Sequence, residues 1–180
     1  SLYLPHGYDS RLLESVNKSV RVIRSTWPAD ALDTKRADER FVVGFYGDFS
    51  ERKEPFLNLE GFAMFVADSE EDLDTFRLFL KVKPDHIQHL DYEQVLTQAG
   101  VPREIVQYPN KAGQKIGLSI STMSHLLRGV DVLLHCSSQE GFGIFQIEAQ
   151  ALGTPVIGTD FGPMSELNGD NRLLMPVSTY

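Results

Sequence analysis

The sequence predicts an α/β domain with a doubly wound, Rossmann-like parallel sheet of about six strands and helices on both faces. Apolar runs of strand length alternate with segments that carry apolar residues at helical spacing. This alternation repeats five times, and parallel strands need helical crossovers between them. The 180 residues suffice for one domain with a sizeable core, so we treat residues 1–180 as a single domain.

The predicted elements follow one another with little space between them. Strands are predicted at residues 41–46, 76–82, 104–108, 131–135 and 155–159, with a candidate sixth at 172–176. Helices are predicted at 55–67, 92–99, 119–128 and 143–152. A glycine ends three of these helices, at Gly100, Gly129 and Gly153. The polar segment 17–40 is predicted to be a lead-in loop before the sheet begins.

Composition excludes several classes of protein. The net charge is −8 and no dense basic stripe is present, so nucleic acid is not an expected partner. A single cysteine, Cys136, excludes an internal disulfide and is predicted to be an inert core residue. No apolar run approaches the roughly 20 residues that span a bilayer. No secretory pattern opens the chain, and we expect a cytoplasmic location.

The loop after the predicted strand 131–135 is the candidate binding loop. Gly141 and Gly143 allow a tight turn and a close approach of the backbone to a ligand. The amides of Gly143, Ile144 and Phe145 are expected at a helix start, where free N–H groups and the helix dipole favour an anion. A diphosphate is a natural occupant of such a place.

Two glutamates eight positions apart belong to the same segment. Glu148 falls within the predicted helix, where its carboxylate could accept hydrogen bonds from the vicinal diol of a ribose. Glu140 precedes the glycines, where a sugar attached to a diphosphate would lie. The residues alone leave open a glycine-rich turn with two solvated glutamates. The loop is not a Walker A motif, since no Gly-Lys-Ser/Thr follows.

These motifs resemble those of family 4 retaining glycosyltransferases, which have the two-domain GT-B fold. Glu140-Gly-Phe-Gly-Ile, Glu148-Ala149 and Leu152-Gly-Thr-Pro-Val-Ile157 resemble the family's EX7E signature and the segment after it. Further similar segments are 4–9, 126–134 and 159–166. The resemblance covers essentially the whole chain and is dense from residue 119 to 166. It implies the donor half of a GT-B fold, a nucleotide-sugar-binding domain without the N-terminal acceptor domain.

The resemblance also implies roles for individual residues. Glu140 and Lys53 are the candidate catalytic residues, facing the donor sugar and the diphosphate, and Glu148 would bind the ribose. The remaining candidates for donor binding are Arg52, Gly47, Gly141, Phe142, Gly143, Ile144, Phe145 and Gly162. Asp48 stands where the family usually has an arginine, and Arg52 could take over that role. The alternative is that Arg52 and Lys53 form a solvated patch at a helix start.

The other polar residues of the sequence do not form a metal-binding pattern. His86 and His89 lack a completing cysteine or carboxylate cluster and are interpreted as a surface pair. His135 is interpreted as structural or lining rather than as a base, and Glu166 as structural. We therefore expect no metal and no cofactor besides the nucleoside-diphosphate sugar that serves as donor substrate.

The implied reaction is transfer of a sugar from a nucleoside diphosphate to an acceptor, with retention of configuration. The isolated domain is expected to bind the nucleotide-sugar but to catalyse little, since it lacks its partner domain. Membrane association of the full-length enzyme is compatible with the sequence but not visible in it. Two alternatives stay open: a related GT-B enzyme, such as a sugar-nucleotide epimerase or a polysaccharide synthase or phosphorylase, and a non-catalytic nucleotide-binding scaffold. The sequence does not identify the base, the sugar, the acceptor, the linkage or the oligomeric state.

Overall fold

The computed structural model describes residues 40–82, 91–107 and 120–177, and six parallel strands form its sheet. The strand order is β3-β2-β1-β4-β5-β6, which is the order of a Rossmann-like fold. The strands are β1 (Phe41–Gly47), β2 (Phe76–Val82), β3 (Val106–Gln107), β4 (Val132–His135), β5 (Val156–Thr159) and β6 (Leu174–Met175). The predicted fold class is confirmed.

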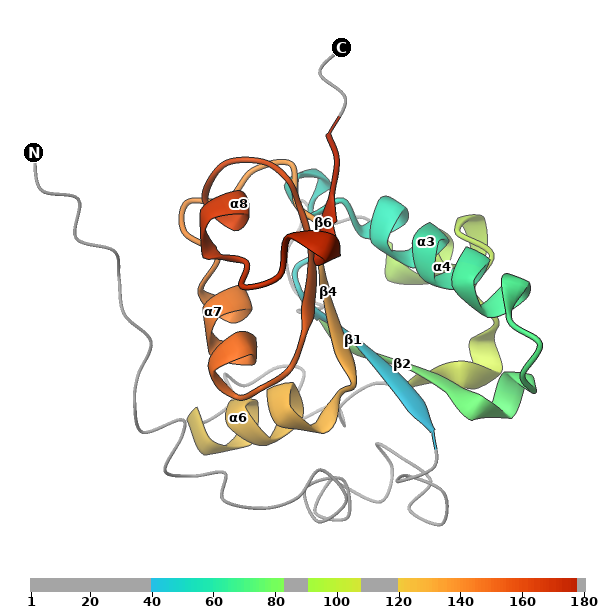
Figure 1. Cartoon of the computed structure of the whole chain (residues 1–180). Helices are drawn as coiled ribbons and strands as arrows, with labels where there is room; N and C mark the ends of the chain where they lie inside the picture. The colour runs from blue at the N-terminus through green and yellow to red at the C-terminus, as the bar shows by residue number, and fades with distance from the viewer. Residues whose placement is uncertain (1–39, 83–90, 108–119, 178–180) are drawn as a thin grey trace, which may run out of the picture.

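Helices cover both faces of the sheet (Figure 1). On one face lie α3 (Pro55–Asp68) and α4 (Tyr92–Gln98). On the other lie α6 (Ile120–Gly129), α7 (Ile144–Ala151) and α8 (Pro163–Leu167). The connecting helices change from one face of the sheet to the other between β3 and β4, because the chain adds strands outward from β1 in one direction and from β4 in the opposite direction.

Each face of the sheet has its own hydrophobic core. Along β1, Val43 and Phe45 belong to the core under α3 and α4, whereas Val42 and Tyr46 belong to the core under α6 and α7. The alternation follows from the two-residue period of a strand. Both cores therefore depend on the same central strands.

The carboxyl ends of β1 and β4 lie side by side at the point where the strand order reverses. Phe45 pairs with Leu134, so the loop after Gly47 and the loop after His135 leave the sheet at the same edge. In open α/β sheets this edge is where ligands bind. The topology thus brings together two segments almost 90 residues apart in the sequence.

The structure differs from the prediction at the short elements. Residues 103–105 form a 3-10 turn, so β3 begins at Val106, two residues later than predicted. Helix α8 was not predicted, because its five residues are too few to show a helical period. Its start has a recognisable signal, since Gly162 precedes Pro163 at the first helical position. The predicted lead-in loop 17–40 lies almost entirely outside the described residues, as do segment 4–9, His86 and His89.

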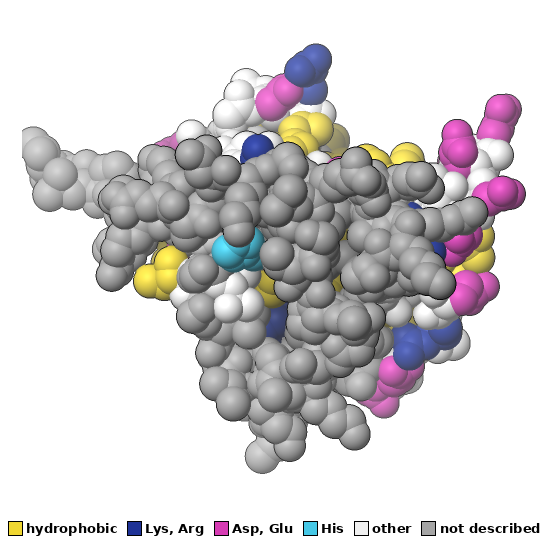
Figure 2. All heavy atoms as spheres, turned by 90° about the horizontal axis from the view of Figure 1, so that it is seen from below, with side chains coloured by type: hydrophobic (Ala, Val, Ile, Leu, Met, Phe, Trp, Pro, Cys, Tyr) yellow, Lys and Arg dark blue, Asp and Glu magenta, His cyan; other side chains and the backbone are white. Residues whose placement is uncertain are grey.

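The described surface is acidic beside the end of α3. Asp68, Glu70, Glu71 and Asp72 are exposed there, in the turn that leads to β2. Figure 2 shows acidic side chains gathered along one margin of the face seen from below. Across the described ranges, no helix combines the length and apolar character that a membrane span requires.

Candidate functional site

A cavity of about 600 Å³ lies at the carboxyl edge of β1 and β4. Its lining comes from the segment 46–53, from the loop and helix start at 140–145, and from single residues of β2, α6 and β4. The lining residues are Tyr46, Gly47, Asp48, Arg52, Lys53, Lys81, Met123, His135, Glu140, Gly141, Phe142, Gly143, Ile144 and Phe145.

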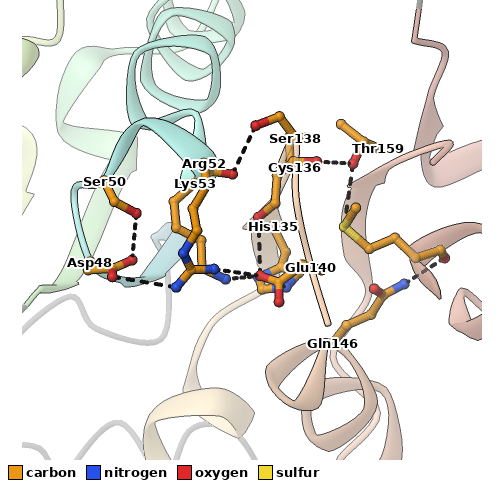
Figure 3. Close-up of polar contacts among 12 residues, drawn as sticks. Asp48, Ser50, Arg52, Lys53, His135, Cys136, Ser138, Glu140, Gln146 and Thr159 are labelled. Atoms are coloured by element: carbon orange, nitrogen blue, oxygen red, sulfur yellow. Dashed lines mark hydrogen bonds and ion pairs between the residues drawn. The ribbon is translucent and has the colours of Figure 1, made fainter. Parts of the chain in front are cut away.

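A tight turn places Lys53 in this cavity. The turn is a 3-10 helix, Glu51–Lys53, in which Lys53 N donates to Ser50 O at 2.9 Å. Glu54 follows with φ +45°, the only positive φ of a non-glycine residue in the described ranges, and α3 begins at the next residue. The turn leaves the Lys53 side chain 9% exposed and pointing toward Glu140 (Figure 3).

Asn58 of α3 joins this turn to the end of β4. Its amide nitrogen lies 2.8 Å from Glu54 O and 2.7 Å from Cys136 O, and its Oδ1 accepts from Cys136 N at 3.1 Å. A further bond runs from Ser138 N to Arg52 O at 2.9 Å. The two halves of the cavity are therefore fixed to each other by backbone groups, not only by charges.

Glu140 has polar contacts with Lys53, Ser137, Arg52 and His135, and all four reach the same oxygen, Oε1 (Figure 3). Lys53 Nζ bonds directly to Glu140 Oε1. Ser137 Oγ lies 3.4 Å from this oxygen, and Arg52 Nη1 lies 3.8 Å from it. The carboxylate is held through Oε1, while no hydrogen bond to Oε2 occurs among the described residues.

His135, the last residue of β4, lines the same cavity and is 3% exposed. Its Nε2 lies 3.5 Å from Glu140 Oε1 and has no hydrogen-bond partner. Burial, which is the largest cause, and the charges of Lys53 and Arg52 together lower the pKa of His135 from 6.5 to about 4, although the charge of Glu140 opposes them. The ring is thus neutral at pH 7, and a pKa near 4 makes it a weak proton acceptor.

Helix α7 begins at the cavity. Its N-cap is Gly143, whose φ of +79° lies in the left-handed region that glycine adopts without strain. Ile144 and Phe145 form the first turn and line the cavity. Because the first N–H groups of a helix have no partner within it, this end favours a negatively charged ligand. Gln146 fixes α7 to α8 by donating to Met164 O at 3.1 Å.

Asp48 modifies the charge at the mouth of the cavity. Its carboxylate accepts from Ser50 Oγ at 3.1 Å and lies 3.5 Å from Arg52 Nη2. The guanidinium of Arg52 thus stands between Asp48 and Glu140, with its side chain 45% exposed. Arg52 belongs to the cavity, but part of its charge is already neutralised.

Nine of the eleven predicted site residues line this one cavity, and two do not. Those that line it are Gly47, Arg52, Lys53, Glu140, Gly141, Phe142, Gly143, Ile144 and Phe145. Glu148 is half-buried on α7, one turn beyond the lining residues. Gly162 caps α8 and is exposed. The ribose and loop roles of these two residues stay predictions.

Sequence reasoning missed Lys81, Met123 and Asn58. Lys81 had a usable signal, because it is a charge near the end of an apolar strand run, 76–82. Asn58 had one too, since it stands among apolar residues on the buried face of a helix where asparagine is a poor helix former. Met123 had none, because a methionine on a helix facing the sheet is ordinary core composition.

Two other features of the described residues bear on ligands. No group of three or more His, Cys, Asp or Glu residues in the described ranges could hold a metal ion.

A second cavity, of about 470 Å³, lies beside α3 and is lined mainly by apolar residues, including Phe62, Phe65 and Ile157. Cys136 lines it as a buried thiol, whose pKa burial raises to about 11.

Comparison with known families gives a match in the C-terminal half of the chain. Residues 94–178 match the sequence profile of the family described as "Glycosyl transferases group 1". A D-inositol 3-phosphate glycosyltransferase from Geodermatophilus obscurus is 28% identical over 169 residues, covering 87% of this chain. The chain spans 35% of the length of that relative. These matches confirm the resemblance that the motifs indicate.

Solved structures with this fold include parts of larger proteins. The C-terminal domain of a glycosyl transferase group 1 family protein from Francisella tularensis has a TM-score of 0.59 at 20% identity, covering 89% of this chain and 80% of that one. Anabaena HepE, in complex with UDP and glucose, has a TM-score of 0.57 at 20% identity, covering 85% and 39%. At these identities the likeness supports the Rossmann-like fold alone.

Proposed function

We propose, from the match of residues 94–178 to the glycosyl transferases group 1 family, that the chain is the donor-binding half of a retaining glycosyltransferase. The donor is a nucleoside-diphosphate sugar, and a second domain outside this chain binds the acceptor. The single observation that carries the proposal is the meeting of Lys53 with Glu140 beside the start of α7, in one cavity at the switch point of the sheet.

The cavity supplies what a diphosphate needs. Lys53 contributes a nearly buried positive charge, and the first turn of α7 contributes N–H groups and the positive end of a helix dipole. Arg52 adds a partly neutralised guanidinium at the mouth. Glu140 lies next to the cations, with Oε2 left to accept from a sugar hydroxyl. Anabaena HepE, a protein of the same fold, binds UDP and glucose.

In the proposed reaction, the bond between the anomeric carbon and the phosphate oxygen breaks, and the acceptor oxygen forms its bond on the same face of the sugar. The proton of the acceptor passes to the departing phosphate, which gains negative charge as the bond breaks. Lys53 and the α7 amides stabilise that charge. Loss of one such preorganised donor slows a reaction by about 10²- to 10³-fold, which is the expected effect of Lys53→Gln in the full-length enzyme.

Ligand-induced stabilisation tests the donor site in this chain. A thermal-shift screen of UDP, GDP and ADP with their hexose derivatives should find a nucleotide that raises the unfolding midpoint, since only the folded state binds it. Titration calorimetry then measures the affinity. Lys53→Gln should weaken binding at least about tenfold, as expected for a lost charge-assisted hydrogen bond. Arg172→Gln removes a cation whose side chain is 88% exposed and is the matched control.

Glu140 gives a second, sharper test. Glu140→Gln should leave the affinity for the nucleoside diphosphate unchanged or higher, because it releases Lys53 from an ion pair. The same variant should lose the additional affinity of the hexose derivative, since Glu140 faces the sugar. If none of the nucleotides binds at millimolar concentration, the proposed donor site is wrong.

One observation favours a second candidate, a non-catalytic nucleotide-binding scaffold. Asp48 lies at the mouth of the cavity, where its carboxylate neutralises part of the charge of Arg52. Asp48→Asn should increase diphosphate affinity under either hypothesis. The full-length protein separates the two hypotheses when it is incubated with a nucleotide-sugar. A product that the unaltered protein forms and the Glu140→Ala variant does not form supports the enzyme. If the unaltered protein forms no product, the scaffold is supported.

A further inference from the structure

One oxygen of Glu140 is surrounded by more donors than it can serve. Within 3.8 Å of Oε1 lie the ammonium of Lys53, Ser137 Oγ, His135 Nε2 and Arg52 Nη1. A carboxylate oxygen offers about two lone-pair sites. The four groups therefore compete, and Lys53 holds the closest position.

His135 is the group that this competition leaves without a bond. The residue is 3% exposed, yet its Nε2 has no hydrogen-bond partner. The distance of 3.5 Å to Glu140 Oε1 is longer than an ordinary N–H···O bond. A buried nitrogen without a partner is unfavourable, and in a native structure it calls for an explanation.

The proposed donor site explains why Nε2 of His135 has no partner in the unliganded chain. A diphosphate carries more negative charge than one carboxylate, so a bound nucleotide draws the ammonium of Lys53 away from Glu140. Glu140, whose side chain is 11% exposed, would then be a nearly buried carboxylate without its main partner. That loss would oppose nucleotide binding unless another donor replaced Lys53.

We propose that His135 is this replacement: when a nucleoside diphosphate engages Lys53, the Nε2–H of His135 donates to Glu140 Oε1 and keeps the carboxylate in place. His135 is a positioning residue in this role, and the inference rests on the proposed function. It needs a shift of only about 0.6 Å to reach normal hydrogen-bond distance. The ring stands at the end of a buried strand, which limits other movements.

The electrostatics of the ring agree with this role. Burial, together with Lys53, holds the pKa of His135 at about 4, so the ring is neutral and carries one N–H near pH 7. A neutral donor can bond Glu140 without adding a positive charge beside Lys53 and Arg52. Ser137, 3.4 Å from the same oxygen, can occupy the second lone pair.

Calorimetric titration of UDP, GDP and ADP into three forms of the full chain tests the proposal. His135→Phe removes the donor and should lower the affinity for the nucleotide that binds by about tenfold, the value of a hydrogen bond to a charged group. His135→Gln places an amide N–H near the position of Nε2 and should restore most of that loss. The unliganded unfolding midpoint of His135→Phe should not fall, because Nε2 bonds nothing in the unliganded state.

A double-mutant cycle identifies the partner. In a Glu140→Gln background there is no carboxylate to compensate, so adding His135→Phe should change the affinity by less than about twofold. An equal loss in both backgrounds, or unchanged binding by His135→Phe alone, would overturn the proposal. A lowered unliganded midpoint without rescue by His135→Gln would show a merely structural role. If the unaltered chain binds none of the three nucleotides, the proposed function fails and this inference fails with it.

Discussion

At the scale of single residues, the ion pair between Lys53 and Glu140 links stability to binding. Both side chains are nearly buried, 9% and 11% exposed. Removing Lys53 leaves the Glu140 carboxylate with only weaker donors, and Lys53→Met should lower the free energy of unfolding by up to about 3 kcal/mol. The double variant Lys53→Met, Glu140→Gln should recover most of that stability but not nucleotide binding. Urea denaturation measures the first effect and calorimetry the second.

The exposed Arg172 again supplies the control for this prediction. Arg172→Gln should change the free energy of unfolding by no more than about 0.5 kcal/mol, as surface substitutions do. If the double variant is as unstable as the two single losses added together, the two charges are not coupled, and the pair does not stabilise the unliganded chain.

His135 should also make stability depend on pH. The pKa of its ring is lowered to about 4 in the folded state, against 6.5 for the free side chain. Between these values the unfolded chain binds a proton that the folded chain does not, so stability is lost as the pH falls through this window. The loss is on the order of 3 kcal/mol over the whole window. Unfolding midpoints measured from pH 7 to 4.5 should therefore fall less steeply for His135→Gln, and equal slopes would contradict the prediction.

At the scale of elements, the start of α7 depends on the backbone of Gly143. Its φ of +79° strains any residue with a Cβ, and Gly143→Ala should cost about 1–2 kcal/mol of stability. Nucleotide affinity should fall as well, because the first turn of α7 lines the cavity. Gly141→Ala is the matched control, since its Cβ would meet nothing within 4 Å and its φ is not positive. Equal stability losses in chemical denaturation would exclude strain at Gly143 as the cause.

The elements also show what sequence patterns can predict. The apolar run 76–82 gives the bounds of β2, because a central strand is buried on both faces and its pattern is unambiguous. The short end strand β3 was predicted too long, since part of its apolar run forms a 3-10 turn. Periodicity identifies long elements well, but a five-residue helix such as α8 contains too few residues to show a period.

At the scale of the whole molecule, the location of the site could be predicted and its contacts could not. The rule that ligands bind at the carboxyl ends of parallel strands points to the loops after Tyr46, Tyr108, His135 and Thr159. The loops after Tyr46 and His135 line the cavity, the loop after Thr159 does not, and the loop after Tyr108 lies outside the described residues. The contact of Lys53 with Glu140 depends on strand order, on the register between β1 and β4, and on the Asn58 bonds. These are long-range features that no local pattern contains.

The shared sheet further predicts that the described fold unfolds as one unit. Adjacent residues of β1 belong to opposite cores, so neither face can lose its packing while the strand stays folded. Leu59 on one face and Leu127 on the other are both fully buried. Leu59→Ala and Leu127→Ala should each lower the free energy of unfolding by about 2–5 kcal/mol. In each variant the far-UV and near-UV circular dichroism transitions should coincide, as a two-state domain requires. A variant that lost near-UV signal first, while far-UV signal persisted, would show that the two faces unfold separately, and a ligand at their shared edge would then stabilise only one of them.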